Sequence, residues 1–246
     1  MKVYDYIRDR RAKVRLHMAL LDPDKQTPEE AGRLAKDATR AGTDAIMVGG
    51  STGVTQALVD ATVLAIKKAS KVPVVLFPAS AGNLSRHADA LYFMSLLNSK
   101  DARFIVGEQR RAAKAIRGWG LETISMAYLV VAPGMRAGVV GRAEPIPRDE
   151  PGLAVEYALA AEMFGMQLVY LEAGSGAPDP VPPAMVRAIR DAIRVPLVVG
   201  GGIRTATQAG AIARAGADVV VTGTIVEIAR DEGALRKIVE AVKAVG

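Results

Sequence analysis

The stretch Leu197-Val198-Val199-Gly200-Gly201-Gly202-Ile203-Arg204 decides the fold. Its apolar start is typical of a buried parallel strand. The three glycines that follow allow backbone N–H groups to converge on an anion, and the helical pattern after them adds the positive end of a helix. Residues 217–224, Ala-Asp-Val-Val-Val-Thr-Gly-Thr, repeat the order of apolar strand, glycine and hydroxyl residue. Two such units in tandem indicate the phosphate site that TIM barrels carry after strands seven and eight, although tight turns alone also use glycine.

Strand-like and helix-like segments alternate along the whole chain, which favours a parallel sheet wrapped by helices. We predict a single α/β domain over residues 1–246, a modified TIM (β/α)8 barrel. The third unit is the exception, because residues 78–89 are too short and too broken for a full helix, so a loop replaces it. The first six predicted strands are 14–21, 45–48, 74–77, 90–96, 122–130 and 168–171. The last two are the apolar runs that begin the stretches 197–204 and 217–224. The predicted helices are 28–41, 55–69, 102–117, 153–164, 183–192, 207–215 and one that ends near Val245, and a Gly/Pro-rich loop is predicted at 132–151.

Composition excludes several classes of function. The chain has no cysteine, so disulfides and thiol catalysis are excluded, and its two histidines argue against a multi-histidine metal site. A net charge of +6 and a pI of about 9.6 are compatible with nucleic-acid binding. However, the basic residues are scattered along helical patterns, and few aromatic residues are available for stacking. Attraction of small anionic substrates explains the charge better, so we expect no nucleic-acid partner.

The sequence shows no membrane-spanning segment. Residues 1–6 lack the apolar core of a signal peptide. No apolar run reaches the roughly 18 residues of a bilayer span. We therefore expect a soluble, cytoplasmic protein.

Candidate catalytic residues follow the predicted strands, because active sites of such barrels lie at the carboxyl ends of the strands. Asp22, with Pro23 fixing the chain, is placed to hold a hard cation such as Mg²⁺ through one carboxylate, and Ser51 or Thr52 can supply a second oxygen. Turn formation and helix capping are the alternative roles for these residues. Glu172 is a candidate base, unless local N–H groups or a lysine satisfy its carboxylate.

Five motifs together resemble the archaeal geranylgeranylglyceryl phosphate synthase family, in its larger group. They span about residues 14–228 in the family's order, and those at 93–99 and 170–177 are the most specific. The motifs are Leu-Asp-Pro-Asp at 21–24, Ile-Met-Val-Gly-Gly-Ser-Thr at 46–52, Phe-Met-Ser-Leu-Leu-Asn-Ser at 93–99, Tyr-Leu-Glu-Ala-Gly-Ser-Gly-Ala at 170–177 and Val-Gly-Gly-Gly-Ile-Arg at 199–204. One departure is the segment 100–104, where the family has a more aromatic stretch.

The resemblance implies a modified TIM barrel without its third helix. It implies an Mg²⁺-dependent prenyltransferase that joins geranylgeranyl diphosphate to the 3-hydroxyl of sn-glycerol 1-phosphate, the first ether bond of archaeal membrane lipids. It also implies a homo-oligomer, either a dimer or a hexamer. Asp22 and Ser51 match the family's magnesium positions. The glycerol-phosphate positions are matched by Tyr170, Leu171, Glu172, Ala173, Gly174, Ser175, Gly176, Gly201, Gly202, Gly223 and Thr224.

The implied chemistry places further demands on the chain. A prenyl tail needs an apolar groove, which the missing helix would open near Phe77, Tyr92 and Met94. Diphosphate-clamping candidates in the third loop are Asn83, Arg86 and His87. The main alternative is another phosphate-binding TIM-barrel enzyme of sugar-phosphate or amino-acid biosynthesis, which needs no lipid groove.

Overall fold

Eight parallel strands form a closed barrel in the computed structural model, which describes residues 2–50, 53–229 and 232–245. Each strand pairs with its neighbours in chain order, and the first pairs with the last, so the prediction of a TIM barrel is confirmed. The strands are β1 (Leu16–Leu21), β2 (Ala45–Val48), β3 (Val74–Leu76), β4 (Ala90–Leu96), β5 (Glu122–Val130), β6 (Leu168–Glu172), β7 (Leu197–Gly200) and β8 (Val219–Thr222).

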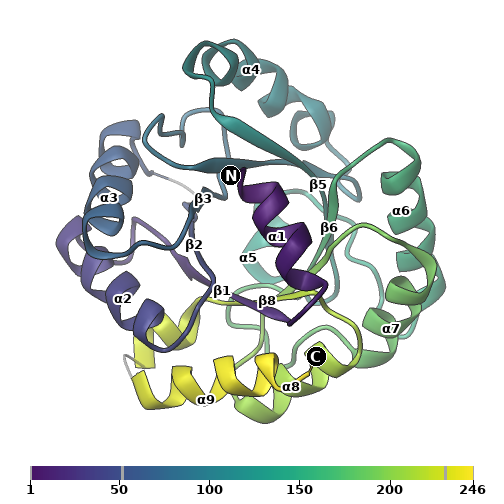
Figure 1. The fold of residues 1–246 in the computed structure, drawn as a ribbon. Coiled ribbons are helices and arrows are strands. Elements are labelled where there is room, and N and C mark those ends of the chain that lie inside the picture. The colour runs from purple at the N-terminus through teal and green to yellow at the C-terminus, as the bar shows by residue number, and fades with distance from the viewer. Residues whose placement is uncertain (1, 51–52, 230–231, 246) are drawn as a thin grey trace.

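Seven helices surround the barrel as an outer layer (Figure 1): α2 (Pro28–Arg40), α3 (Gln56–Ala69), α4 (Glu108–Trp119), α6 (Pro151–Met163), α7 (Pro183–Ala192), α8 (Ala206–Arg214) and α9 (Glu232–Lys243), as far as the described residues show. Two further helices, α1 (Val3–Arg11) and α5 (Met135–Val140), lie over the ends of the barrel. Two π-helical turns, η1 (Arg103–Gly107) and η2 (Ile225–Ala229), precede α4 and α9. Among the described residues, no helix is long and apolar enough to cross a membrane.

Local sequence signals explain where several helices begin. The Thr27 hydroxyl accepts a hydrogen bond from the Glu30 N–H at the start of α2, and Pro28 occupies the first helical position. Thr205 and Gln208 form a reciprocal capping box at the start of α8. These caps fix the helices directly after the loops that carry the candidate site.

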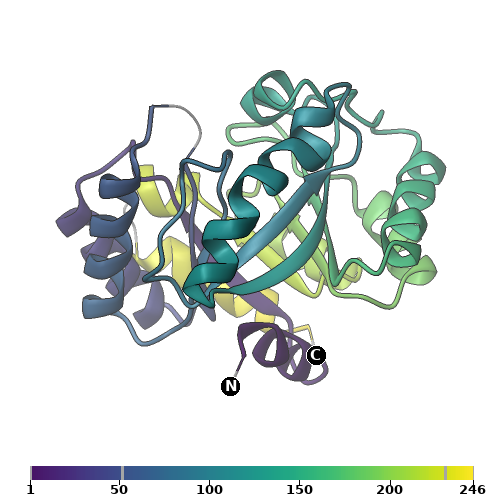
Figure 2. The same cartoon turned by 90° about the horizontal axis from the view of Figure 1, so that it is seen from above.

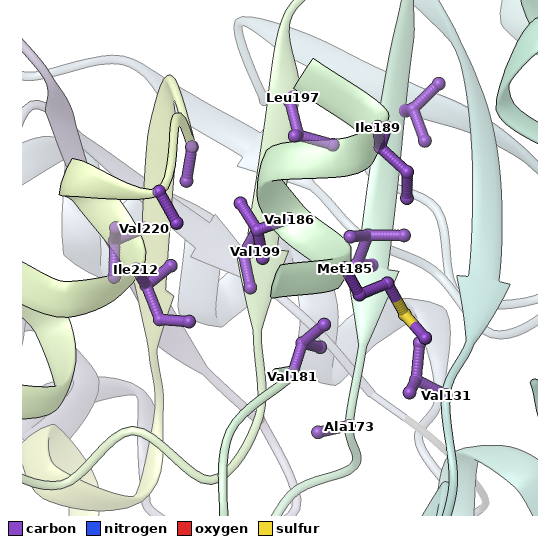
Figure 3. Packing of buried hydrophobic residues seen from close by; sticks show 14 of the residues in the cluster. Val131, Ala173, Val181, Met185, Val186, Ile189, Leu197, Val199, Ile212 and Val220 are labelled. Atoms are coloured by element: carbon purple, nitrogen blue, oxygen red, sulfur yellow. The ribbon is translucent and has the colours of Figure 1, made fainter. Parts of the chain in front are cut away.

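The core has two layers, as the alternation of side chains along a barrel strand requires. Residues that point inward fill the barrel and form one cluster, which includes Met18, Met126 and Tyr170. Residues that point outward pack against the helices. Figure 3 shows part of this outer layer, where Val199 and Val220 from the strands meet helix residues such as Ile189 and Ile212.

The unit after β3 has no helix between residues 77 and 89, all of which are described, so the predicted replacement by a loop is confirmed. This segment is therefore an open side of the helical layer, between α3 and α4. The cavity described below extends towards this side.

Four local predictions were wrong. The first strand begins at Leu16 and not at residue 14, and a helix precedes it. This helix, α1, crosses the amino-terminal opening of the barrel (Figure 1), where the Glu122 carboxylate accepts hydrogen bonds from the N–H groups of Val3 and Tyr4. The segment predicted as one helix at 102–117 divides into η1 and α4, and the loop predicted at 132–151 contains α5.

Candidate active site

A cavity of about 350 Å³ lies at the carboxyl ends of the strands. Its polar part is lined by residues that include Asp22, Glu172 and Ser175, and by the glycine turns after β7 and β8. Its apolar part extends between β4 and α4, where Phe93, Met94 and Ile116 are among the lining residues. One continuous space therefore joins a polar site to an apolar groove.

Glu172 ends β6 in the polar part and is only 6 % exposed. Burial raises the pKa of its carboxyl group to about 7, and the nearby Asp22 carboxylate adds to this rise. The Gly174 N–H, which donates to Glu172 Oε1 at 2.6 Å, and the hydroxyls of Tyr128 and Tyr170 pull the pKa down. The result is a carboxylate that can exchange a proton near neutral pH, which is what a general base needs.

The glycine triplet 200–202 makes room for this arrangement. A Cβ on Gly200 would overlap the Tyr170 hydroxyl. A Cβ on Gly201, whose φ is +85°, would lie 2.5 Å from Glu172 Oε1 and 2.6 Å from the Gly174 nitrogen. A Cβ on Gly202 would meet the backbone at Asp179. Gly200 and Gly201 are required by close packing on Tyr170 and Glu172, and Gly202 by close packing on the loop at Asp179, a role that the sequence pattern alone did not reveal.

Gly223 differs from the triplet. A Cβ there would meet the backbone and side chain of Leu20 at 3.5 Å or more, which is ordinary contact, and Gly223 and Thr224 both line the cavity. The turn after β8 therefore has space for an added methyl group, whereas the turn after β7 has none.

The predicted glycerol-phosphate positions separate into two groups. Tyr170, Glu172, Ser175, Gly201, Gly202, Gly223 and Thr224 line the cavity. Leu171 and Ala173 belong instead to the outer hydrophobic cluster, as the alternation along β6 requires. Neither Gly174 nor Gly176 lines the cavity, and the Gly174 N–H already donates to Glu172.

Asp22 lies at the carboxyl end of β1 and lines the same cavity. Its Oδ2 is 2.6 Å from Lys25 Nζ, which is also 2.8 Å from Oε2 of the buried Glu227. Glu227 Oε1 in turn accepts a hydrogen bond from the Asp22 N–H at 2.8 Å. This cluster links the loop after β1 to the η2 turn, and a Cβ on Gly49 would overlap Asp22 Oδ1.

The donor set at Asp22 suits a weakly held hard cation. Ser51, the other predicted magnesium position, lies outside the described residues. No group of three or more acidic, histidine or cysteine side chains that could hold a metal occurs among the described residues. Mg²⁺ is commonly bound by one or two carboxylates, with substrate phosphates and water completing its shell. A single carboxylate at Asp22, in a cavity that also takes a phosphorylated substrate, would therefore suit a cation that arrives with that substrate.

The apolar part of the cavity contains the three residues expected to border a prenyl groove. Phe77, Tyr92 and Met94 all line it. The Phe77 ring stacks on Tyr170 with the ring centroids 5.3 Å apart, so aromatic side chains connect the groove to the polar part.

The third-loop candidates Asn83, Arg86 and His87 are not among the residues that line the cavity. The Asn83 side chain is bonded within its own region, since its amide donates to the Val54 carbonyl and its oxygen accepts from Ser80.

Four residues of the site were not given a role by sequence reasoning. Lys25, Tyr128 and Arg136 line the cavity, and Glu227 lies behind Asp22. Lys25 and Tyr128 occur at strand ends and could have been found from position. Arg136 lies in a segment expected to be a loop, and Glu227 in a turn that follows the predicted phosphate motif.

The fold and this cavity define a TIM-barrel protein with an enzyme-like site at the carboxyl ends of its strands. The chain belongs to the PcrB family, whose model matches residues 5–242. A relative from Thermococcus gammatolerans named geranylgeranylglyceryl phosphate synthase is 53 % identical and aligns over 97 % of this chain and 95 % of its own length. One of the same name from Pyrococcus horikoshii is 52 % identical over 98 % and 95 %, respectively.

The fold is also shared with a solved structure of high similarity. (S)-3-O-geranylgeranylglyceryl phosphate synthase from Thermoplasma acidophilum, in complex with its substrate sn-glycerol-1-phosphate, superposes with a TM-score of 0.97. It is 45 % identical, and the match covers 100 % of both chains.

Proposed function

We propose that this protein is a prenyltransferase that joins geranylgeranyl diphosphate to the 3-hydroxyl of sn-glycerol 1-phosphate, in archaeal ether-lipid biosynthesis. The products are geranylgeranylglyceryl phosphate and diphosphate. The relatives' names support the reaction. The observation that carries it in this molecule is the position of Glu172, a buried carboxylate with a pKa near neutrality, in a cavity with one polar and one apolar part. The alternative, another phosphate-binding barrel enzyme, leaves the apolar groove unexplained.

The reaction follows from this geometry. The glycerol oxygen attacks the allylic carbon of the prenyl chain, the bond from that carbon to the diphosphate oxygen breaks, and its electron pair leaves with the diphosphate. Glu172 accepts the hydroxyl proton as the new ether bond forms. Holding both substrates in one cavity lowers the entropic cost of bringing the hydroxyl to the allylic carbon.

Glycerol phosphate is proposed to lie in the polar part. Ser175 and Thr224 offer hydroxyl groups, and Gly223 offers open backbone close to them. Backbone N–H groups in such turns bind phosphate because they carry partial positive charge and have no side chain in the way. Tyr170, whose burial raises its pKa well above the usual range, stays protonated, so its hydroxyl keeps donating to Glu172 throughout the neutral range.

Mg²⁺ is proposed as the cofactor, held by Asp22 and by Ser51. When bound, the ion neutralises negative charge on the departing diphosphate. Lys25, whose Nζ is 2.6 Å from Asp22 Oδ2, lies beside the same carboxylate.

We also propose that the protein is a cytoplasmic homo-oligomer, a dimer or a hexamer. Large apolar side chains are exposed on two helices, with Met163 83 % exposed at the end of α6 and Val139 80 % exposed on α5. Phe164 directly follows α6 and is 75 % exposed. Met163 and Phe164 are neighbours in the chain, and contiguous exposed apolar surface is a mark of contact with another subunit. Sedimentation as a monomer at micromolar concentration would reject the assembly, and cell fractionation tests the compartment.

A direct test of the reaction follows diphosphate release. Purified protein with geranylgeranyl diphosphate, sn-glycerol 1-phosphate and Mg²⁺ is expected to release diphosphate only when both substrates are present. Glycerol 3-phosphate is the matched control, because it differs only in stereochemistry. Release that does not require glycerol 1-phosphate, or no release at all, would contradict the proposal.

A further inference from the structure

The cavity holds two substrates with a large combined negative charge, yet few of its lining side chains are cationic. Among the described lining residues, the cationic side chains are those of Lys25 and Arg136. Lys25 is already bound to two carboxylates, those of Asp22 and Glu227. A phosphate monoester carries close to two negative charges at neutral pH, and a diphosphate ester carries more. Arg136 lines the same cavity from a different element, which makes it a candidate for a second contact to a substrate phosphate.

The position of the Arg136 backbone is fixed, because α5 packs on the ends of β4, β5 and β6. The Gly134 N–H donates to the Ala173 carbonyl at 3.2 Å, and Gly174 packs so closely on Met135 that an added Cβ would lie 2.6 Å from the Met135 Cβ. A Cβ on Gly134 would lie 2.5 Å from the Val130 side chain at the end of β5.

The other end of α5 is fixed against β4. A Cβ on Gly141 would overlap the Leu96 side chain, and the Gly141 carbonyl accepts a hydrogen bond from Ser99 Oγ at 2.7 Å. The helix therefore spans from β6 to β4 across the mouth of the cavity, which Arg136, Ala137 and Val140 line. Figure 2 shows the two termini at the opposite end of the barrel from this mouth.

The helix α5 lies between the polar and the apolar part of the cavity. The first turn of α5 adjoins the segment after Glu172, and its last turn adjoins Leu96 in the apolar part. A diphosphate attached to a chain in the apolar part, with its allylic carbon close to Glu172, has to pass this junction. Asp22 approaches it from β1, which lies opposite β5 in the closed ring.

We infer that Arg136 binds the diphosphate of the prenyl substrate from the side opposite Asp22. The inference rests on the proposed function. The guanidinium group suits this task, because its planar fork can donate two parallel hydrogen bonds to phosphate oxygens. The side chain is exposed at the cavity mouth and can engage the diphosphate as the substrate enters.

The test measures binding of inorganic diphosphate, in the presence of Mg²⁺, and of glycerol 1-phosphate in a separate calorimetric titration. Arg136→Ala is expected to weaken diphosphate binding by about 10- to 100-fold, the usual effect of losing hydrogen bonds from a charged group. Glycerol 1-phosphate affinity is expected to stay within about twofold of the wild type, because the proposed site of its phosphate is formed by Ser175, Gly223 and Thr224 and not by α5. Arg136→Lys keeps the charge but not the fork, so it should recover part of the affinity.

Arg142→Ala is the matched control, since Arg142 lies two residues after the end of α5, is 72 % exposed in its side chain and is not among the residues that line the cavity. It should bind diphosphate as the wild type does. Wild-type diphosphate affinity in Arg136→Ala, or a loss confined to glycerol 1-phosphate, would overturn the inference. The contact between Arg136 and diphosphate can fail independently of the proposed reaction, because diphosphate binding is measured without turnover. A wild-type protein that makes no prenyl ether would refute the proposed function and leave the binding result unaffected.

Discussion

Tyr128→Phe tests whether Glu172 acts as the base and whether its tyrosine partners set its pKa. Glu172 is protonated below its pKa of about 7 and cannot accept a proton there, so kcat/KM should rise with pH and level off above neutrality. The Tyr128 hydroxyl donates to the carboxylate and lowers that pKa. Removing the donor leaves the burial of Glu172 in place, so the pKa must rise.

The size of the change follows from the strength of the lost bond. A hydrogen bond to a charged group is worth about 1.5–3 kcal/mol, and each pKa unit corresponds to about 1.4 kcal/mol. The rising limb of the profile should therefore move upward by about one to two pH units in Tyr128→Phe. Both tyrosines stay protonated over this range, because burial raises their pKa well above the usual value.

The assay is kcat/KM for glycerol 1-phosphate from about pH 5.5 to 9.5. Tyr6→Phe is the control, because it removes a tyrosine hydroxyl that donates to the Asp44 carbonyl, at the amino-terminal end of the barrel. Its profile should match the wild type. If the rising limb of the pH profile stays in place in Tyr128→Phe, the reasoning is refuted. Such a limb would instead reflect the ionisation of the substrate phosphate, which does not respond to the loss of the Tyr128 hydroxyl.

Three other predictions concern the same site and the barrel that holds it. Gly223→Ala should fold normally and raise the KM for glycerol 1-phosphate. Gly201→Ala should disturb Glu172 and lower kcat, because its Cβ would lie 2.5 Å from the carboxylate. Steady-state kinetics that show the same change in KM and kcat for both variants would contradict this. Asp22→Ala should abolish Mg²⁺-dependent turnover while calorimetry still detects glycerol 1-phosphate binding, and activity independent of added Mg²⁺ would count against the metal site. His17 is fully buried between Thr43 and Thr222, and burial lowers its pKa to about 3. The unfolded chain binds the proton more readily, so the free energy of unfolding should fall as pH drops below about 6.5, by at most about 1.4 kcal/mol per pH unit. In urea denaturation, His17→Gln should lose this part of the pH dependence, and an unchanged slope would exclude His17 as its source.

The barrel could be predicted because its signals are local and repeated. Helix 183–192 and strand 122–130 were predicted with the observed bounds, since prolines mark the start of the helix and an apolar run marks the strand. The helix α1 was missed because only Val3 and Ile7 are buried along it, and it has no side-chain cap. The short helix α5 was missed because its six residues follow a Gly/Pro-rich stretch and are held by contacts with Leu96, Val130 and Gly174, which are distant in sequence.

The candidate site was only partly predictable for the same reason. Asp22 and Glu172 were found because a carboxylate at a strand end is visible in the sequence. The partners of Glu172 were not, because a Tyr128 hydroxyl near a carboxylate is a consequence of strand register, in which Tyr128 faces Tyr170. The glycines at 200 and 201 were interpreted as phosphate turns, whereas their immediate neighbours are Tyr170 and Glu172. Only the assembled barrel brings these residues together.

Mass spectrometry of the reaction product is the most direct test of the proposed function. The protein is incubated with sn-glycerol 1-phosphate, Mg²⁺ and an equal mixture of prenyl diphosphates with 15, 20 and 35 carbons. We expect the mass of the 20-carbon prenyl ether of glycerol phosphate to predominate. In Glu172→Gln we expect the rate at which this product forms to fall by about 10²–10⁴-fold, the usual contribution of a general base. A product from the 15- or 35-carbon substrate alone would contradict the assigned chain length, and the absence of any ether product would contradict the prenyltransferase itself.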